Sequence, residues 1–361
     1  MFKTVAAFDR IGEENAFAVL ARAMQLAAQG RDIINLGIGQ PDFRTPDFIV
    51  EAAIKALRDG HHGYTPAVGI LAVREAVAAD LGKRFAVKVS PDEVMIMPGG
   101  KPTMFMSILM FGEPGADILY PDPGFPIYRS MIEYTGARPV PVPIREENNF
   151  AFSAEETLKL ITPRTRLLIL NSPANPTGGV TPKAEVDKLV AGLERYPDVA
   201  IMSDEIYDHM LYDGEKHVCL LAYPSIRDRL ILLNGWSKTY AMTGWRLGYA
   251  VWPGKLYEYA RKLAVKSALL RQRLSAICRA CRAHRPPRRA GADGGGVRQA
   301  PQSSGHRLEQ APGNVLRHAE RRVLCFSQYQ AHRMESQSLG VGAPRRRRRG
   351  ADRRARFRHS R

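Results

Sequence analysis

The chain has 361 residues, of which 45% are hydrophobic and 25% are charged, and it carries a formal net charge of +17 at pH 7. A chain of this length can bury a large core, and one large plus one small domain is the natural expectation. It contains no apolar run of about 18 residues or more, which argues against a membrane span. Residues 1–10 also lack the apolar core of a signal peptide, so we expect a cytoplasmic protein.

The positive charge is confined to the last quarter of the chain. Residues 1–270 contain 30 Lys and Arg against 31 Asp and Glu, whereas residues 271–361 contain 23 Arg, no Lys and 5 acidic residues. An excess spread over the whole chain would favour nucleic-acid binding. The near-neutral first 270 residues are instead typical of an enzyme.

The spacing of apolar residues places helices and strands along the first 265 residues. Predicted helices cover residues 12–29, 47–59 and 69–84, and further helices begin near residues 102, 125, 153 and 181. Predicted strands lie at residues 94–97, 117–120, 138–142, 167–170, 199–202, 230–233 and 248–251. Ser153 and Glu156 form a predicted capping box, and Pro182 is predicted as a first helical residue. Strands that alternate with helices predict an α/β domain with a largely parallel sheet, whose ligands bind at the carboxyl ends of the strands.

The sequence changes character after about residue 265. Lysine disappears, arginine dominates and the apolar periodicity fades, so residues 266–361 are a poor candidate for a packed domain. We interpret this segment as an Arg-rich tail that is out of frame or disordered. Our hypothesis for its origin is a shift of the reading frame near codons 266–270. The alternative is a genuine basic arm that binds nucleic acid. Cys278 and Cys281 have the spacing of half a zinc site, but no second pair with such spacing accompanies them, and we predict no metal site.

Residues 234–249, NGWSKTYAMTGWRLGY, contain the lysine around which we interpret the chain. The apolar run at residues 230–233 before it is typical of a buried parallel strand. Lys238 is predicted on a tight turn, where Gly235 and Ser237 allow a bulky group to approach the backbone. Burial lowers the pKa of a lysine toward that of a nucleophilic amine, which can form a Schiff base with an aldehyde. A solvated lysine on a loop is the alternative at this stage.

Other loops carry further candidates. Residues 99–101, Gly-Gly-Lys, follow a strand and open a helix, where backbone N–H groups bind phosphate, although a plain turn is the alternative. Asp204 stands at the end of a predicted strand and could instead be an N-cap. Asn175 lies in NSPANPTGG, whose Asn-Pro-Thr-Gly is also an ordinary turn. Phe125 could be a core aromatic residue or a stacking platform for a ring.

The strings SKTYAMTGWRLGY at residues 237–249 and NSPANPTGG at residues 171–179 resemble the pyridoxal-phosphate-dependent aminotransferases of class I/II, of the aspartate/alanine aminotransferase type and fold type I. The resemblance covers roughly residues 1–265. It implies an N-terminal segment over residues 1–45, with a helix and a substrate loop, and a large domain that binds pyridoxal 5′-phosphate over residues 46–265. In that large domain helices would flank a mostly parallel sheet. The small C-terminal domain of the family is absent or scrambled in this sequence.

The resemblance also implies roles for individual residues. Lys238 would form the Schiff base with the cofactor and move the substrate's α-proton as a catalytic residue. Asp204 would pair with the pyridinium nitrogen, which keeps the ring an electron acceptor. Tyr207 and Asn175 would contact the phenolic oxygen of the cofactor, and Phe125 would stack on its ring.

Phosphate and substrate contacts follow from the same resemblance. The residues implied to hold the phosphate are Gly99, Gly100, Lys101, Ser237 and Arg246. Tyr64 matches the tyrosine that reaches the phosphate in a partner subunit, which implies a homodimer with shared active sites. Gly39 and Asn175 are implied to bind the substrate. Gly235 stands where many relatives have a serine that touches the phosphate, and the family's substrate-carboxylate arginine cannot be placed in residues 271–361.

By resemblance, the chain would transfer an amino group from an L-amino acid to a 2-oxo acid. The alternatives are a β-lyase of the same fold, or an inactive truncated product. A cofactor-dependent regulator that binds DNA would need an extra helix-turn-helix domain, and we see no room for one before the body of the chain. DNA binding becomes an option again if the basic tail is genuine. The donor amino acid stays open between aspartate, alanine and an aromatic residue.

Overall fold

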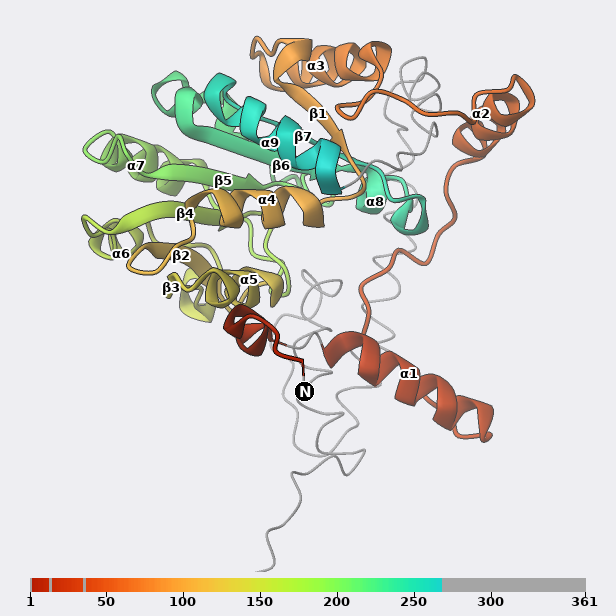
Figure 1. The fold of residues 1–361 in the computed structure, drawn as a ribbon, viewed down its shortest axis with the longest axis horizontal. Coiled ribbons are helices and arrows are strands. Elements are labelled where there is room, and N and C mark those ends of the chain that lie inside the picture. Colours follow the sequence, from red (N-terminus) through yellow and green to blue (C-terminus); the bar gives the residue numbers. More distant parts are fainter. Residues whose placement is uncertain (1, 13–14, 35–36, 268–361) are drawn as a thin grey trace, which may run out of the picture.

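The structure is a computed structural model of the chain, and it describes residues 2–12, 15–34 and 37–267. Its described part is organised around one seven-stranded sheet with the strand order β1-β7-β6-β5-β4-β2-β3 (Figure 1). The strands are β1 Val94–Met97, β2 Asp117–Asp122, β3 Arg138–Pro143, β4 Thr165–Asn171, β5 Ala200–Asp204, β6 Leu230–Gly235 and β7 Gly248–Val251. The pairs from β6 through β5, β4 and β2 to β3 are parallel, whereas β7 runs antiparallel to both β6 and β1. The predicted largely parallel α/β sheet is confirmed.

Helices connect the strands and flank the sheet. The α-helices are α1 Asn15–Ala28, α2 Asp47–Arg58, α3 Leu71–Phe85, α4 Lys101–Phe111, α5 Ile127–Thr135, α6 Ala154–Lys159, α7 Lys183–Leu193, α8 Trp236–Thr239 and α9 Gly254–Ser267. Short 3₁₀ helices cover Ala6–Arg10, Pro91–Glu93, Glu146–Asn148, Leu220–Ala222, Pro224–Arg229 and Thr243–Trp245. Among the described residues, none of these helices is both long and apolar enough to cross a membrane.

The two faces of the sheet are covered by different helices. Successive residues of a strand point to opposite faces, so neighbours such as Ile201 and Met202 enter different cores. Ile201 belongs to the core that includes residues of α3, α6 and α7. Met202 belongs to the core that includes residues of α4, α5 and α9. The result is a three-layer domain in which the central strands β4, β5 and β6 are buried along almost their whole length.

Three local predictions need adjustment. Pro182 is the N-cap of α7, one position before the first helical residue. Ser153 does cap α6, because its hydroxyl accepts the Glu156 amide at 3.3 Å, but the Glu156 carboxylate binds Arg145 Nη1 at 2.6 Å. The reciprocal half of the capping box is thus replaced by an ion pair. Lys238, predicted on a turn, lies on the short helix α8.

Helix α2 is linked to the segment that follows Lys238. Ile49 and Ala53 of α2 pack with Met242 and Leu247 in a small separate apolar cluster. Residues 266–267 end α9, and the rest of the predicted tail, with Cys278 and Cys281, lies outside the described residues. The domain boundaries proposed from the sequence therefore stay predictions.

Candidate active site

A cavity of about 520 Å³ opens at the carboxyl ends of the parallel strands. The loops after β1, β2, β4, β5 and β6 all reach it, as expected where parallel strands end at one edge of a sheet. Ten of the twelve site residues predicted from the sequence line this cavity: Gly39, Gly100, Lys101, Phe125, Asn175, Asp204, Tyr207, Ser237, Lys238 and Arg246. Residues from seven separate segments of the chain thus meet in one place, although their individual roles stay predictions.

Lys238 enters the cavity from α8, immediately after the buried strand β6. Its amine donates a hydrogen bond to the carbonyl oxygen of Gly39 and lies 5.6 Å from the ring centroid of Tyr207. Gly235 pairs with Gly248 of β7, and a Cβ at position 235 would lie 2.9 Å from the Cα of Gly248. A side chain at position 235 would therefore push β6 and β7 apart, which gives a steric reason for glycine at this position.

Asp204 ends β5 and is almost completely buried, with 2% of its surface exposed. Tyr128 donates its hydroxyl to Asp204 Oδ2 at 2.7 Å, and the amide of Ile206 donates to Oδ1 at 3.3 Å. Burial nevertheless raises the pKa of the Asp204 carboxyl to about 6, because desolvation outweighs these hydrogen bonds and the attraction to Lys238. A cationic group bound in the cavity would compensate for this desolvation and keep the carboxylate ionised.

Asn171 connects the Asp204 loop to the Asn175 loop. Its side-chain oxygen accepts the amide of Asn175 at 2.7 Å, and its Nδ2 donates to the carbonyl of Asp204 at 3.0 Å. The sequence analysis did not single out Asn171 or Tyr128. Asn171 begins the string NSPANPTGG, and Tyr128 lies three residues after Phe125 near the start of α5. The one sequence signal for Asn171 and Tyr128 was that they lie a few residues from the predicted residues Asn175 and Phe125.

Glycines and one arginine form the end of the cavity near α4. Gly99 has a positive φ of 84°, and a Cβ there would lie 2.2 Å from Nη2 of Arg246. Arg246 is held by the carbonyl oxygens of Thr243 at 2.8 Å and Pro98 at 3.3 Å. The first backbone N–H groups of a helix have no partner within the helix, and they attract anions. The start of α4 and the Arg246 guanidinium together form a suitable place for a phosphate group.

Lys101, Gly99 and Tyr64 differ in how they lie relative to the cavity. Lys101 Nζ lies 5.3 Å from the ring centroid of Phe125, so a cation already faces the aromatic ring that was predicted to stack on the cofactor. Gly99 does not line the cavity but stands behind Arg246, where only glycine fits. Tyr64 is not among the residues that line the cavity and is 78% exposed. Its predicted reach into a partner subunit therefore stays a prediction.

Comparison with known proteins now decides the family. Residues 31–283 match the family described as aminotransferase class I and II. The chain belongs to this family. The match extends 18 residues past residue 265, where we placed the end of the resemblance, and residues 284–361 lie beyond it. The frameshift hypothesis for the tail stays a prediction.

Several aminotransferases are similar to this chain in sequence. An aspartate aminotransferase of Pyrococcus abyssi is 37% identical over 73% of this chain and 68% of the relative. An aspartate/prephenate aminotransferase of Nitrosomonas europaea is 38% identical over 66% of this chain and 60% of the relative. An aromatic-amino-acid aminotransferase of Thermococcus litoralis is 39% identical over 70% of this chain and 65% of the relative. The matched part thus spans about two thirds of the length of these curated relatives.

Solved structures show the same fold. The aspartate aminotransferase from Rhizobium meliloti superposes with a TM-score of 0.79 at 28% identity, over 86% of this chain and 78% of that structure. The aspartate aminotransferase from Thermus thermophilus with maleate gives a TM-score of 0.77 at 31% identity, over 86% of this chain and 80% of that structure. The predicted fold type I architecture is therefore confirmed for the described residues.

Aminotransferases of class I and II depend on pyridoxal 5′-phosphate, and the residues around this cavity fit that cofactor. The helix start with Gly100 and Arg246 suits its phosphate, and a buried carboxylate with a raised pKa suits a protonated ring nitrogen. The amine of Lys238 suits its aldehyde. All of these groups line one cavity whose volume is in the range of cofactor sites.

Proposed function

We propose that this chain carries the cofactor site of an aminotransferase, which moves an amino group from an L-amino acid to a 2-oxo acid with pyridoxal 5′-phosphate. The observation that carries the proposal is the convergence of three unlike groups on one cavity. The amine of Lys238, the buried carboxylate of Asp204 and the guanidinium of Arg246 all line it. An amine for the aldehyde, an acid for the ring nitrogen and a site for the phosphate are the groups that this cofactor needs from a protein.

Cofactor binding is assigned to the walls of the cavity. The backbone N–H groups of Gly100 and Lys101 at the start of α4 bind the phosphate together with Arg246, since Pro102 has no N–H. The hydroxyl of Ser237, which also lines the cavity, adds a contact. Gly99 and Gly100 keep this end open, since a Cβ at Gly99 would strike Arg246 and one at Gly100 would lie 3.1 Å from Leu233. Lys101 belongs to the same end of the cavity, beside the ring of Phe125. Phe125 provides an aromatic wall.

Proton transfer is assigned to Lys238 and Asp204. The bound cofactor supplies a ring that accepts electrons from the substrate's α-carbon. Asp204 holds a proton on the ring nitrogen, and its own hydrogen bonds to Tyr128 and Ile206 fix its orientation. Lys238 carries the proton to and from the substrate's α-carbon as a general base and acid. Tyr207 and Asn175 contact the phenolic oxygen, and Gly39 binds the substrate carboxylate together with Asn175.

Substrate choice is proposed from the relatives. Their names include aspartate, prephenate and aromatic amino acids, so we infer a dicarboxylic or aromatic amino acid as the donor. Assembly as a homodimer with shared sites and a cytoplasmic location are further parts of the proposal. The exposed ring of Tyr64 is compatible with a contact to a second copy. Nucleic acid enters as a partner only if the Arg-rich tail is a genuine segment.

The experiment uses the full chain with added pyridoxal 5′-phosphate, and it compares the unsubstituted protein with Lys238→Ala. We expect an imine absorbance band of the cofactor that requires Lys238, and keto-acid formation from aspartate or tyrosine that requires a 2-oxo acid acceptor. An unchanged band in Lys238→Ala would contradict the assignment of the lysine. Keto-acid release without an acceptor would identify a β-lyase, and cofactor binding without turnover would identify an inactive product.

A further inference from the structure

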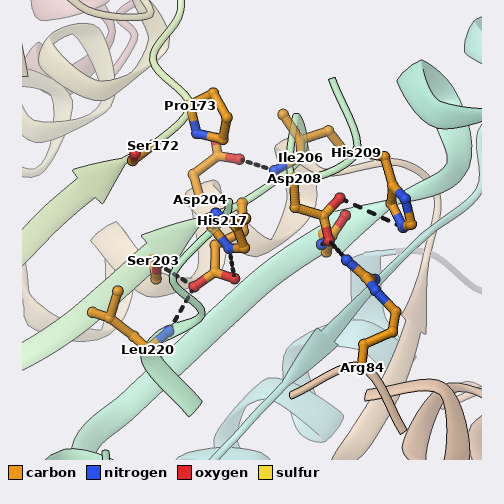
Figure 2. Close-up of polar contacts among 12 residues, drawn as sticks. Arg84, Ser172, Pro173, Ser203, Asp204, Ile206, Asp208, His209, His217 and Leu220 are labelled. Carbon is orange, nitrogen blue, oxygen red and sulfur yellow. Dashed lines mark hydrogen bonds and ion pairs between the residues drawn. The ribbon is translucent and has the colours of Figure 1, made fainter. Parts of the chain in front are cut away.

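A second buried polar cluster lies behind the active-site loop, on the side away from Asp204. Asp208 follows Asp204 by four residues, and its side chain is fully buried. Arg84 of α3 donates from Nη2 to Asp208 Oδ2 at 2.5 Å, and Asn234 donates from Nδ2 to the same oxygen at 2.9 Å. Figure 2 shows Arg84 reaching Asp208, while Asp204 and Ile206 lie on the preceding part of the same loop.

Asn234 links this cluster to the lysine segment. It lies in β6, one residue before the N-cap of α8 and four residues before Lys238. Its side-chain oxygen accepts the amide of Gly235 at 2.6 Å while its Nδ2 binds Asp208. The amide side chain is therefore held at both ends. It joins the backbone just before α8 to the loop that bears Asp204 and Tyr207.

An aromatic contact supports the same segment from β7. The ring of Trp236, which begins α8, lies 5.3 Å from the ring of Tyr249, centroid to centroid. Tyr249 is the strand partner of Asn234. Burial, and after it the negative charge of Asp208, raise the pKa of the Tyr249 hydroxyl. Asn234 is thus bound to Asp208, and Trp236 packs on the strand partner of Asn234.

Stability alone is a weak reason for such a cluster. A buried ion pair loses about as much in desolvation as it gains in attraction, and well-packed apolar residues often serve stability equally well. A fixed geometry is what a charged, doubly hydrogen-bonded contact supplies. Here the contact fixes the distance between two loops that both carry residues of the candidate site.

We propose that Arg84, Asp208 and Asn234 act as positioning residues, which hold the start of α8 so that the Lys238 amine meets the aldehyde carbon of the cofactor. The inference rests on the proposed function. None of the three residues lines the cavity, so they act through the backbone at Gly235 and not by contact with the cofactor. At the phosphate end of the cavity, the start of α4 and Arg246 lie outside α8, and of the proposed phosphate contacts only Ser237 lies on the helix that this cluster holds.

Two small-molecule probes separate these roles. Pyridoxal 5′-phosphate uses the phosphate end, the ring contacts and Lys238, whereas 4′-deoxypyridoxine 5′-phosphate has no aldehyde and uses only the phosphate and ring contacts. In Asn234→Ala we expect binding of the aldehyde to weaken by about 10-fold or more, since small displacements of a reacting group are costly. Binding of the deoxy analogue should change by less than about 3-fold, a difference within the usual effect of one weak contact. The pH midpoint of the Lys238-dependent absorbance should also move.

The chain offers a matched control at the other end of the sheet. Asp117 is likewise buried, and it is bound by Arg138 at 2.6 and 2.8 Å and by the neutral hydroxyl of Thr162 at 2.9 Å. Thr162→Ala removes a neutral donor from an Arg–Asp cluster, as Asn234→Ala does. It should lower the thermal midpoint comparably and leave the affinity for both probes unchanged.

A second variant keeps the test decisive if Asn234→Ala does not fold. Asn234→Asp has the same size and still accepts the Gly235 amide, but it no longer donates to Asp208 at pH 8. Relative to the unsubstituted chain, its aldehyde binding should be weak at pH 8 and recover toward pH 5, where a protonated carboxyl donates again. The proposal is overturned if Asn234 variants weaken both probes equally or neither. If the unsubstituted chain shows no Lys238-dependent absorbance, it is the proposed function that fails.

Discussion

Asp117 and Asp204 are buried at opposite ends of the same sheet, and their surroundings shift their pKa values in opposite directions. Asp117 begins β2, where Arg138 and the Thr162 hydroxyl bind its carboxylate and lower its pKa below the usual value. Asp204 ends β5, where its hydrogen bonds come from the Tyr128 hydroxyl and the Ile206 amide, and burial raises its pKa to about 6. At the amino end the charge is compensated within the protein, as stability requires. At the carboxyl end the proposed function assigns this compensation to the bound cofactor.

The largest expected difference between the two aspartates concerns turnover. Asp204→Ala should lower kcat by roughly 10³-fold, because the charge that holds the ring nitrogen protonated is lost while the phosphate contacts remain. Asp117→Ala should leave kcat per folded molecule within about 2-fold, since it removes no group near the cavity. Steady-state kinetics with cofactor occupancy measured in parallel checks both. A near-normal kcat for Asp204→Ala would remove this residue from its proposed role.

A second difference concerns the pH dependence of stability without cofactor. Asp204 has a folded pKa above its unfolded value, so the folded state binds more protons between about pH 4 and 6 and loses stability as pH rises through that window. The loss amounts to about 3 kcal/mol at most, from 1.36 kcal/mol for each of roughly two pKa units. Asp117 has a lowered pKa, so its contribution is present above pH 4 and is lost as pH falls further.

Urea unfolding of the cofactor-free chain between pH 3.5 and 8 measures this comparison. Asp204→Asn should remove the decline between pH 4 and 6, and Asp117→Asn should remove the loss of stability on further acidification. Saturating pyridoxal 5′-phosphate should also suppress the Asp204 effect in the unsubstituted chain. A decline between pH 4 and 6 that persists in Asp204→Asn would assign it to a different group.

The smallest expected effects come from removing one hydroxyl at each aspartate. Tyr128→Phe deletes the hydrogen bond to Asp204 Oδ2, which should raise the pKa of that carboxyl further and lower kcat by about 10-fold. Thr162→Ala deletes the corresponding bond to Asp117 and should cost about 1–2 kcal/mol of unfolding free energy without a change in kcat. Equal effects on kcat from both variants would erase the distinction between the two sites.

The sequence predicted much of this arrangement, and its failures have physical causes. The central strands β4, β5 and β6 were placed by their apolar runs, because strands buried on both faces need such runs. Asp204 was predicted at the end of a strand, and Lys238 and Asn175 were predicted on loops after strands, while the resemblance of their motifs implied their roles. Tyr128 and Asn171 were missed because a hydrogen bond between distant segments leaves no spacing signal.

The second cluster was beyond the reach of sequence analysis for the same reason. Arg84 and Asp208 are 124 positions apart, and either could be a surface charge when only the sequence is known. Helix caps were predicted less well than strands. The Glu156 carboxylate could accept either a backbone amide or Arg145, and in the structure it binds Arg145. Propensity and spacing report on neighbours in the chain, whereas these choices depend on neighbours in space.

The most direct test of the central claim is the site of covalent attachment. The full chain would be incubated with pyridoxal 5′-phosphate, reduced with borohydride, digested and analysed by mass spectrometry. The account predicts a cofactor-derived mass on the peptide that contains Lys238, and its loss in Lys238→Ala. Attachment at Lys101 instead, or at scattered surface lysines with none at Lys238, would contradict it.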